Sequence, residues 1–152
     1  MTIAQVERTA QTTLLATFFV RDALCALDAA GVQEVIRLVA VTPVRHASDE
    51  VAGVINLRGK IVTLLDIGMV LGLGRAPASR DSRVFIVEDR TEFLGLLVDR
   101  VGEVLEVDPE LEEPLPVNIP AAQARFFRGV YRANGHVIAL LNPITLLAES
   151  RT

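Results

Sequence analysis

The chain has 152 residues, of which 51% are hydrophobic, and its formal net charge at pH 7 is −4. This charge argues against a nucleic-acid-binding protein, because binding to phosphates needs a basic face, and the single lysine, Lys60, and the scattered arginines form no basic cluster. The hydrophobic fraction suffices for one full core or two small ones.

The first half of the chain is predicted to form short strands separated by turns. Residues 1–13 are polar and are predicted to form a flexible tail. Glycine at position 59 allows the tight turn of a hairpin over residues 53–67. Residues 75–82 are predicted to form an exposed linker. Strands are predicted at residues 15–20, 24–27, 32–39, 54–55 and 61–65, and helical turns at residues 29–30 and 67–73.

The second half repeats this scheme. Four prolines between residues 108 and 120 predict an extended crossing loop that contains no helix. Pro143 is expected to open a short helix at residues 144–148. Regularly spaced short strands with turn signals are typical of an all-β barrel or sandwich. Strands are predicted at residues 83–87, 93–98 and 101–107 and in both arms of a hairpin around Asn134-Gly135, and a helical turn is predicted at residues 121–127.

Two parts of the chain have similar sequence patterns. Residues 53–66 return as residues 129–142 at a constant offset, since 129 − 53 = 76 and 142 − 66 = 76. Each copy has a glycine followed by an apolar residue, a turn that ends in glycine, an apolar strand, and then Asp or Asn. Residues 32–36 similarly match residues 101–105, with 101 − 32 = 69. These matches predict two similar β units fused in one chain.

No leader or membrane segment is evident in the sequence. The N-terminus has no basic start followed by an apolar run, and the apolar stretch at residues 61–73 is too short to span a bilayer of about 30 Å. The one cysteine, Cys25, lies in an apolar segment and is expected to be a small buried side chain. We therefore expect a cytoplasmic protein.

Residue patterns for catalysis, metal binding or cofactor binding are missing. The glycines of residues 72–74 lack the third glycine of a dinucleotide motif, because Pro77 occupies its position. The two histidines, His46 and His136, lie far apart in the sequence, and no cysteine pair accompanies them. We expect no enzymatic activity, no metal and no cofactor.

The residues around the first hairpin carry a family resemblance. The strongest motif is the sequence Gly-Val-Ile-Asn-Leu-Arg-Gly-Lys-Ile-Val at residues 53–62, with support from residues 32–36, 95–101 and 127–130. With these motifs the chain resembles the CheW family, the coupling proteins of bacterial chemosensory arrays, from about residue 14 to 147. The resemblance implies an all-β fold of two packed five-stranded SH3-like β-barrels with a short C-terminal helix. Residues 14–152 would then form one domain with lobes at roughly 14–80 and 81–152.

The resemblance also implies a function. CheW-like proteins are non-catalytic adaptors that couple transmembrane chemoreceptors to a CheA-type histidine kinase. The implied partners are the regulatory domain of that kinase and the cytoplasmic tip of methyl-accepting chemoreceptors, with ring assembly with the kinase or with itself as a further possibility. Nucleic-acid binding and direct membrane insertion are not implied. The protein would be cytoplasmic and recruited to membrane-associated receptor arrays.

The family's receptor groove and its support are carried over residue by residue. Glu34 and Arg58 are expected to form a pair that braces the first barrel, contacts the receptor, or does both. The valines either line an apolar groove between the barrels or pack in the core. Kinase contacts are expected at the outer ends of the barrels, without assigned residues. The nine candidate residues are Val32, Glu34, Gly53, Asn56, Leu57, Arg58, Gly59, Val101 and Val104.

Three positions depart from the family's pattern. Asp22 stands at a turn where glycine is frequent, Thr63 where proline is usual, and Gly68 where a basic residue is common. Two other functions stay open beside the main reading. One is an accessory coupler of a non-flagellar pathway for pili, development or second-messenger output. The other is a barrel that senses a small molecule in the cleft between the barrels.

Overall fold

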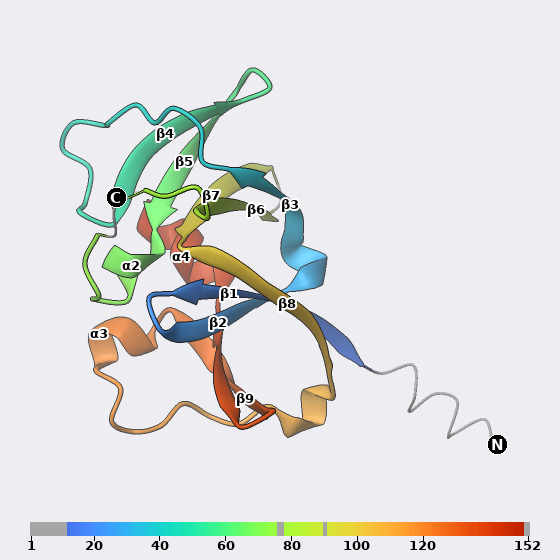
Figure 1. Cartoon of the computed structure of the whole chain (residues 1–152). Helices are drawn as coiled ribbons and strands as arrows, with labels where there is room; N and C mark the ends of the chain where they lie inside the picture. The colour runs from blue at the N-terminus through green and yellow to red at the C-terminus, as the bar shows by residue number, and fades with distance from the viewer. Residues whose placement is uncertain (1–11, 76–77, 90, 151–152) are drawn as a thin grey trace.

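The computed structural model describes residues 12–75, 78–89 and 91–150 (Figure 1). Most of these residues belong to short strands, and the helices have one or two turns. The strands are β1 (Thr13–Val20), β2 (Ala23–Asp28), β3 (Val32–Arg37), β4 (Val51–Leu57), β5 (Lys60–Asp66), β6 (Arg83–Asp89), β7 (Glu92–Val98), β8 (Arg100–Val107), β9 (Phe127–Ala133) and β10 (His136–Leu141). The helices are η1 (Ala29–Gly31), α2 (Ile67–Val70), η2 (Pro109–Leu111), α3 (Ala121–Ala124) and α4 (Pro143–Ser150).

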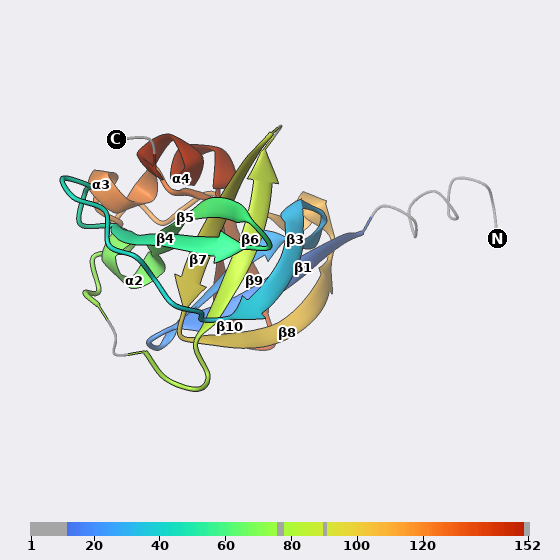
Figure 2. The same cartoon turned by 90° about the horizontal axis from the view of Figure 1, so that it is seen from above.

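The strands form two five-stranded sheets. The central sheet has the order β3-β6-β7-β5-β4, and the terminal sheet has the order β8-β1-β2-β10-β9. Each sheet curls into a small barrel, and Figures 1 and 2 show the two barrels packed against each other. The predicted all-β fold of two packed five-stranded SH3-like barrels with a short C-terminal helix is confirmed.

Three groups of buried side chains form the interior. One lies inside each barrel, around Ile138 in the terminal sheet and around Val62 in the central sheet. The third and largest group lies between the sheets, where the ring centroids of Phe18 and Phe85 are 5.1 Å apart. Helix α4 lies between the two strand layers in Figure 1 and contributes Leu146 to this shared core. The barrels therefore bury apolar surface against each other, which fixes their relative orientation.

The two sheets have the same arrangement of strands, although the chain enters them at different points. The parallel pair is β5 with β7 in the central sheet and β10 with β2 in the terminal sheet, and all other pairs are antiparallel. Strands β3, β4 and β5 thus correspond to β8, β9 and β10, which contain the segments that match in the sequence. Bridges outside the strands also correspond, Thr42 with Val54 and Glu113 with Val130.

The sheets do not divide the chain at residue 80 as the expected lobes do. The central sheet takes all its strands from residues 32–98, whereas the terminal sheet joins residues 13–28 to residues 100–141. Parallel pairing of β10 with β2 closes the terminal sheet, because it covers the edge that the N-terminal hairpin would otherwise expose. The matching segments reveal the duplication, but not which strands pair.

The structure corrects two smaller predictions, one for the crossing loop and one for the N-terminal tail. The crossing loop contains one turn of 3₁₀ helix, η2, which begins at Pro109 because proline suits the first helical position and the Asp108 side chain accepts a hydrogen bond from the Glu110 amide. Residues 1–11 of the expected tail lie outside the described residues, but Thr13 already belongs to β1. Next to it, the Thr12 hydroxyl donates to Glu106 at 2.7 Å.

Candidate functional site

The Glu34–Arg58 pair lies at one end of the central barrel. Arg58 Nη1 donates to Glu34 Oε1 at 3.0 Å, and Nη2 donates to Oε2, so the contact is a two-point fork. Strands β3 and β4 are the opposite edges of the central sheet, so this contact closes the end of the barrel where no strand pairing does. The pair is near the surface, with 69% of the Arg58 side chain and 31% of the Glu34 side chain exposed. Hydrogen bonding from Arg58 lowers the pKa of Glu34.

The local sequence places Arg58 at the tip of the β4–β5 hairpin. Arg58 and Gly59 both have positive φ, 49° and 87°, as a two-residue turn that matches the twist of the strands requires. The Asn56 side chain accepts a hydrogen bond from the Gly59 amide at 2.8 Å and so fixes the turn. Leu57 packs on the core of the central barrel. The structure thus brings together five predicted residues, Glu34 and Asn56–Gly59.

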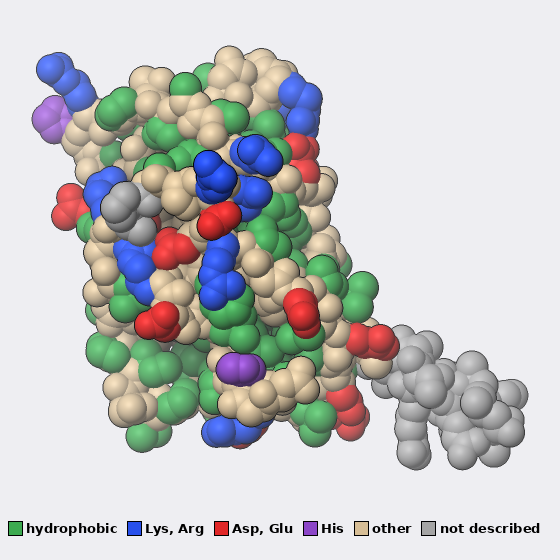
Figure 3. Space-filling model, in the orientation of Figure 1, with side chains coloured by type: hydrophobic (Ala, Val, Ile, Leu, Met, Phe, Trp, Pro, Cys, Tyr) green, Lys and Arg blue, Asp and Glu red, His purple; other side chains and the backbone are tan. Residues whose placement is uncertain are grey.

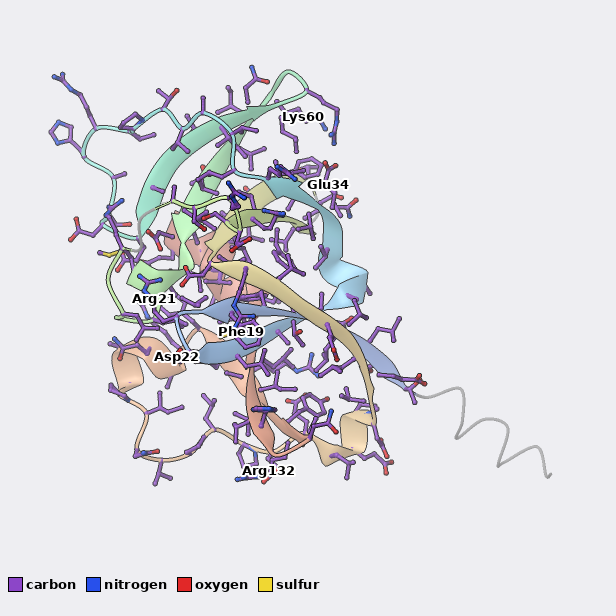
Figure 4. The ribbon with its side chains drawn as sticks, in the orientation of Figure 1. Phe19, Arg21, Asp22, Glu34, Lys60 and Arg132 are labelled. Atoms are coloured by element: carbon purple, nitrogen blue, oxygen red, sulfur yellow. The ribbon has the colours of Figure 1, made fainter. Side chains whose placement is uncertain are left out.

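Lys60 and Phe93 belong to the same cluster, although neither is among the nine candidate residues. Lys60 Nζ lies 4.5 Å from the centre of the Phe93 ring, a cation–π contact. Figure 4 shows Lys60 and Glu34 at this end of the barrel. With Arg58 they line a hollow of about 300 Å³. The sequence could have indicated Lys60, because it directly follows Gly59 of the turn. Phe93 could not be found in this way, because it lies in the site only as a result of the pairing of β7 with β5.

Gly53 lies away from this cluster, near the start of β4. Its φ is 147°, and a Cβ atom there would lie 2.7 Å from Val41 Cγ1 and closer still to the Thr42 carbonyl oxygen. The glycine therefore lets the segment before β4 pair with it through the bridge of Thr42 and Val54. Glycine at this position therefore serves the backbone geometry.

The three candidate valines have different surroundings. Val32 is partly buried and packs against the core shared by the barrels. Val101 and Val104 lie on β8, the edge strand of the terminal sheet, and both are exposed, Val104 by 63%. Val35, which was not among the candidates, is exposed on β3 at the position that corresponds to Val104, so the sequence match could have identified it. Figures 1 and 2 show β3 and β8 on the same side of the molecule.

A separate polar contact, which involves Arg21, joins the two barrels. The Arg21 guanidinium in the β1–β2 turn binds Asp99 at 3.0 Å and donates to the Gly74 carbonyl oxygen. A Cβ atom on Gly68 would lie 2.8 Å from Arg21 Nη2, so glycine at this position leaves room for the guanidinium of the other barrel. The residue with positive φ in this turn is Arg21, at 55°, so position 22 does not require glycine. Figure 4 shows Arg21 and Asp22 together at this turn.

The described residues offer little reactive chemistry. Cys25 is buried, and burial raises the pKa of its thiol to about 12, which keeps it protonated. Within residues 12–75, 78–89 and 91–150, His, Cys, Asp and Glu side chains form no group of three that could hold a metal ion. Across the same ranges, each helix is too short or too polar to span a bilayer.

Comparisons with known proteins agree with this geometry. The model of the CheW-like domain family matches residues 15–151. A chemotaxis protein CheW of Rhizobium meliloti is 31% identical over 127 residues, covering 84% of this chain and 82% of that protein. A probable chemotaxis protein CheW of Rhizobium etli is 27% identical over 138 residues, covering 91% and 89%.

A solved structure has the same fold. The crystal structure of the scaffolding protein TtCheW from Thermoanaerobacter tengcongensis superposes with a TM-score of 0.79 and 32% sequence identity, covering 86% of this chain and 84% of that chain. The similarity therefore extends over both barrels.

Proposed function

Since the chain belongs to the CheW-like domain family, we propose that it binds its receptor through the edge strands β3 and β8 and the tip of the β4–β5 hairpin. The protein is a non-catalytic scaffold that couples transmembrane chemoreceptors to a CheA-type histidine kinase in bacterial chemosensory signalling. Its work is geometric: one rigid body holds two partners and changes the balance between kinase states only by contacting those states differently.

The observation that carries the receptor proposal is a pair of equivalent exposed valines. Val35 on β3 and Val104 on β8 occupy corresponding positions in the two sheets, and both are exposed. Together with Val101 they give the two edge strands an apolar surface on one side of the molecule, where Figure 3 shows apolar side chains between charged ones. A helical receptor tip with an apolar stripe is a suitable counterpart for such a surface.

The outer ends of the barrels support the proposal of a kinase contact. Ile61 follows the turn of the β4–β5 hairpin and Val137 follows the turn of the β9–β10 hairpin, and both are exposed. Each barrel thus presents one apolar residue at the equivalent place beside its turn. A partner built from the same kind of barrel, such as the regulatory domain of the kinase or a second copy of this chain, would find a related surface at either end, which is what a ring requires.

The proposed place of action follows from these partners. Receptor tips and the kinase lie on the cytoplasmic side of the membrane in the family's systems, so we expect this chain in the cytoplasm at receptor arrays. Recruitment would depend on protein contacts, because the exposed surface described above is suited to a partner helix rather than to bilayer insertion.

The decisive experiment is a reconstitution of kinase activity with receptor-containing membranes and the full chain. Val104→Asp should weaken receptor binding by at least about tenfold and remove receptor control of the kinase, because a charge would be placed in an apolar contact. Val117→Asp is the matched control, since Val117 is fully exposed in the crossing loop. Equal receptor control with Val104→Asp and wild type would contradict the proposed surface.

A further inference from the structure

The terminal barrel contains a hollow of about 600 Å³ beside the edge strand β8, and Val101 of the proposed receptor surface is among the residues that line it. All its lining residues belong to the terminal sheet or to the turn between β9 and β10, so the hollow lies at the mouth of one barrel and not between the barrels. Its wall includes the apolar side chains of Leu24, Leu105 and Ile138. Glu103 is the one acidic residue among the lining side chains.

This hollow corresponds to the smaller hollow around Arg58 in the central barrel. Glu103 on β8 corresponds to Glu34 on β3, and Asn134 corresponds to Arg58 at the hairpin tip, by the offsets of 69 and 76 residues. The backbone agrees, because Asn134 has a φ of 52° where Arg58 has 49°. The two sites therefore have the same turn conformation and a glutamate at the equivalent position.

What differs is the side chain that covers the carboxylate. In the central barrel the Arg58 guanidinium binds Glu34 and the hollow measures about 300 Å³. In the terminal barrel, asparagine is too short to make that contact, and among the described residues no ion pair to Glu103 is formed. Glu103 is exposed and lines a hollow that is about twice as large as the hollow around Arg58 in the other barrel.

We propose that this hollow receives an arginine side chain of a partner polypeptide. The guanidinium binds the Glu103 carboxylate as the Arg58 guanidinium binds Glu34, and the aliphatic stem lies on the apolar wall. Arg100, on the same wall, is stacked on the Phe19 ring at 3.6 Å, and Figure 4 shows Phe19 beside β8. Recognition depends on the two-point fork that arginine offers to a carboxylate and lysine lacks.

A binding experiment tests the site itself, independently of receptor and kinase. The probe is N-acetyl-arginine N-methylamide, titrated into the ¹⁵N-labelled full chain and followed by two-dimensional NMR. We expect saturable shifts of amides in β8 and the β9–β10 turn, at least about tenfold weaker binding to Glu103→Gln, and unchanged binding to Glu106→Gln, an exposed glutamate on the same strand. The neutral citrulline analogue should not bind.

A second variant places the arginine within the chain. Asn134→Arg should place a guanidinium beside Glu103 from the same backbone geometry and abolish binding of the probe. Because this ion pair is exposed like that of Arg58, the melting temperature should change little. Absence of saturable shifts with the arginine probe, equal shifts with citrulline, or equal affinity of Glu103→Gln and wild type would each overturn the proposal.

Discussion

The β4–β5 and β9–β10 hairpins share a backbone and differ in what they present. Both turns have positive φ at two successive residues, Arg58-Gly59 and Asn134-Gly135, and both hairpins are followed by a residue that caps a helix, Asp66 or Asn142. In one barrel the tip binds a carboxylate across the barrel mouth, and in the other it leaves that carboxylate free. The two repeats thus share the residues that determine the turn conformation. They differ in the side chain that determines whether an ion pair forms across the end of the barrel.

The core between the barrels should respond equally to changes from either side. Phe18 belongs to the terminal barrel and Phe85 to the central one, and both are fully buried in ring contact. We expect Phe18→Ala and Phe85→Ala each to lower the free energy of unfolding by about 3–5 kcal/mol, because each leaves a cavity in the shared core. Urea unfolding followed by circular dichroism measures this. Two separate transitions, or a loss for only one variant, would show that the barrels fold independently.

The two equivalent glycines should differ in their tolerance of alanine. Gly53 combines a φ of 147° with close backbone contact, whereas Gly129, its counterpart, has no positive φ although a Cβ atom would lie 2.8 Å from the Glu113 carbonyl oxygen. Gly53→Ala should therefore destabilise the fold by about 2 kcal/mol or more, and Gly129→Ala by less. Melting temperatures of the two variants, measured side by side, decide this, and the reverse order would contradict the argument.

The hairpin tip can be exchanged with little cost to the fold. Arg58→Asn gives the central turn the residue of the terminal one, and asparagine accepts positive φ readily. The melting temperature should change little, because the lost ion pair is exposed, whereas receptor control of the kinase should be lost if Arg58 contacts the receptor. A variant that keeps full control in the reconstituted assay would limit Arg58 to bracing the barrel.

The smallest expected effect is a pH dependence of the melting temperature that comes from the Glu34–Arg58 pair at the tip of the β4–β5 hairpin. The Arg58 contact lowers the pKa of Glu34 in the folded chain, so its stabilising contribution is present above the unfolded pKa of about 4.3 and is lost as the pH falls through the lower folded value. The difference in melting temperature between wild type and Arg58→Asn should therefore shrink as the pH is lowered from about 6 through the unfolded pKa of Glu34 and below it. A difference that persists at the acid end would argue against this linkage.

Much of the fold follows from local patterns in the sequence. Asn134-Gly135, the glycine at 59 and the β-branched runs predicted the hairpins, because turn geometry and strand propensity depend on neighbouring residues. The division of the sheets did not follow, since pairing of β2 with β10 joins residues more than a hundred positions apart. The repeat at residues 53–66 identifies equivalent strands but is silent on the order in which they assemble.

The candidate site was predictable to the extent that its residues are contiguous or matched by motif. The Glu34–Arg58 contact was expected and is present. Phe93 was missed because it comes from a strand with no motif of its own, whereas Val35 could have been found from its match to Val104. The hollow beside Glu103 was beyond prediction, because it arises from a side chain that is short where its counterpart is long.

The interleaved origin of the terminal sheet has a consequence for synthesis on the ribosome. All strands of the central sheet have emerged once residue 98 has left the exit tunnel, whereas β1 and β2, made first, must wait for β10, made almost last. Their apolar side chains, Phe18 and Leu27 among them, stay without their final neighbours through most of translation. The nascent chain is therefore most exposed to aggregation and to chaperone capture at its oldest segment.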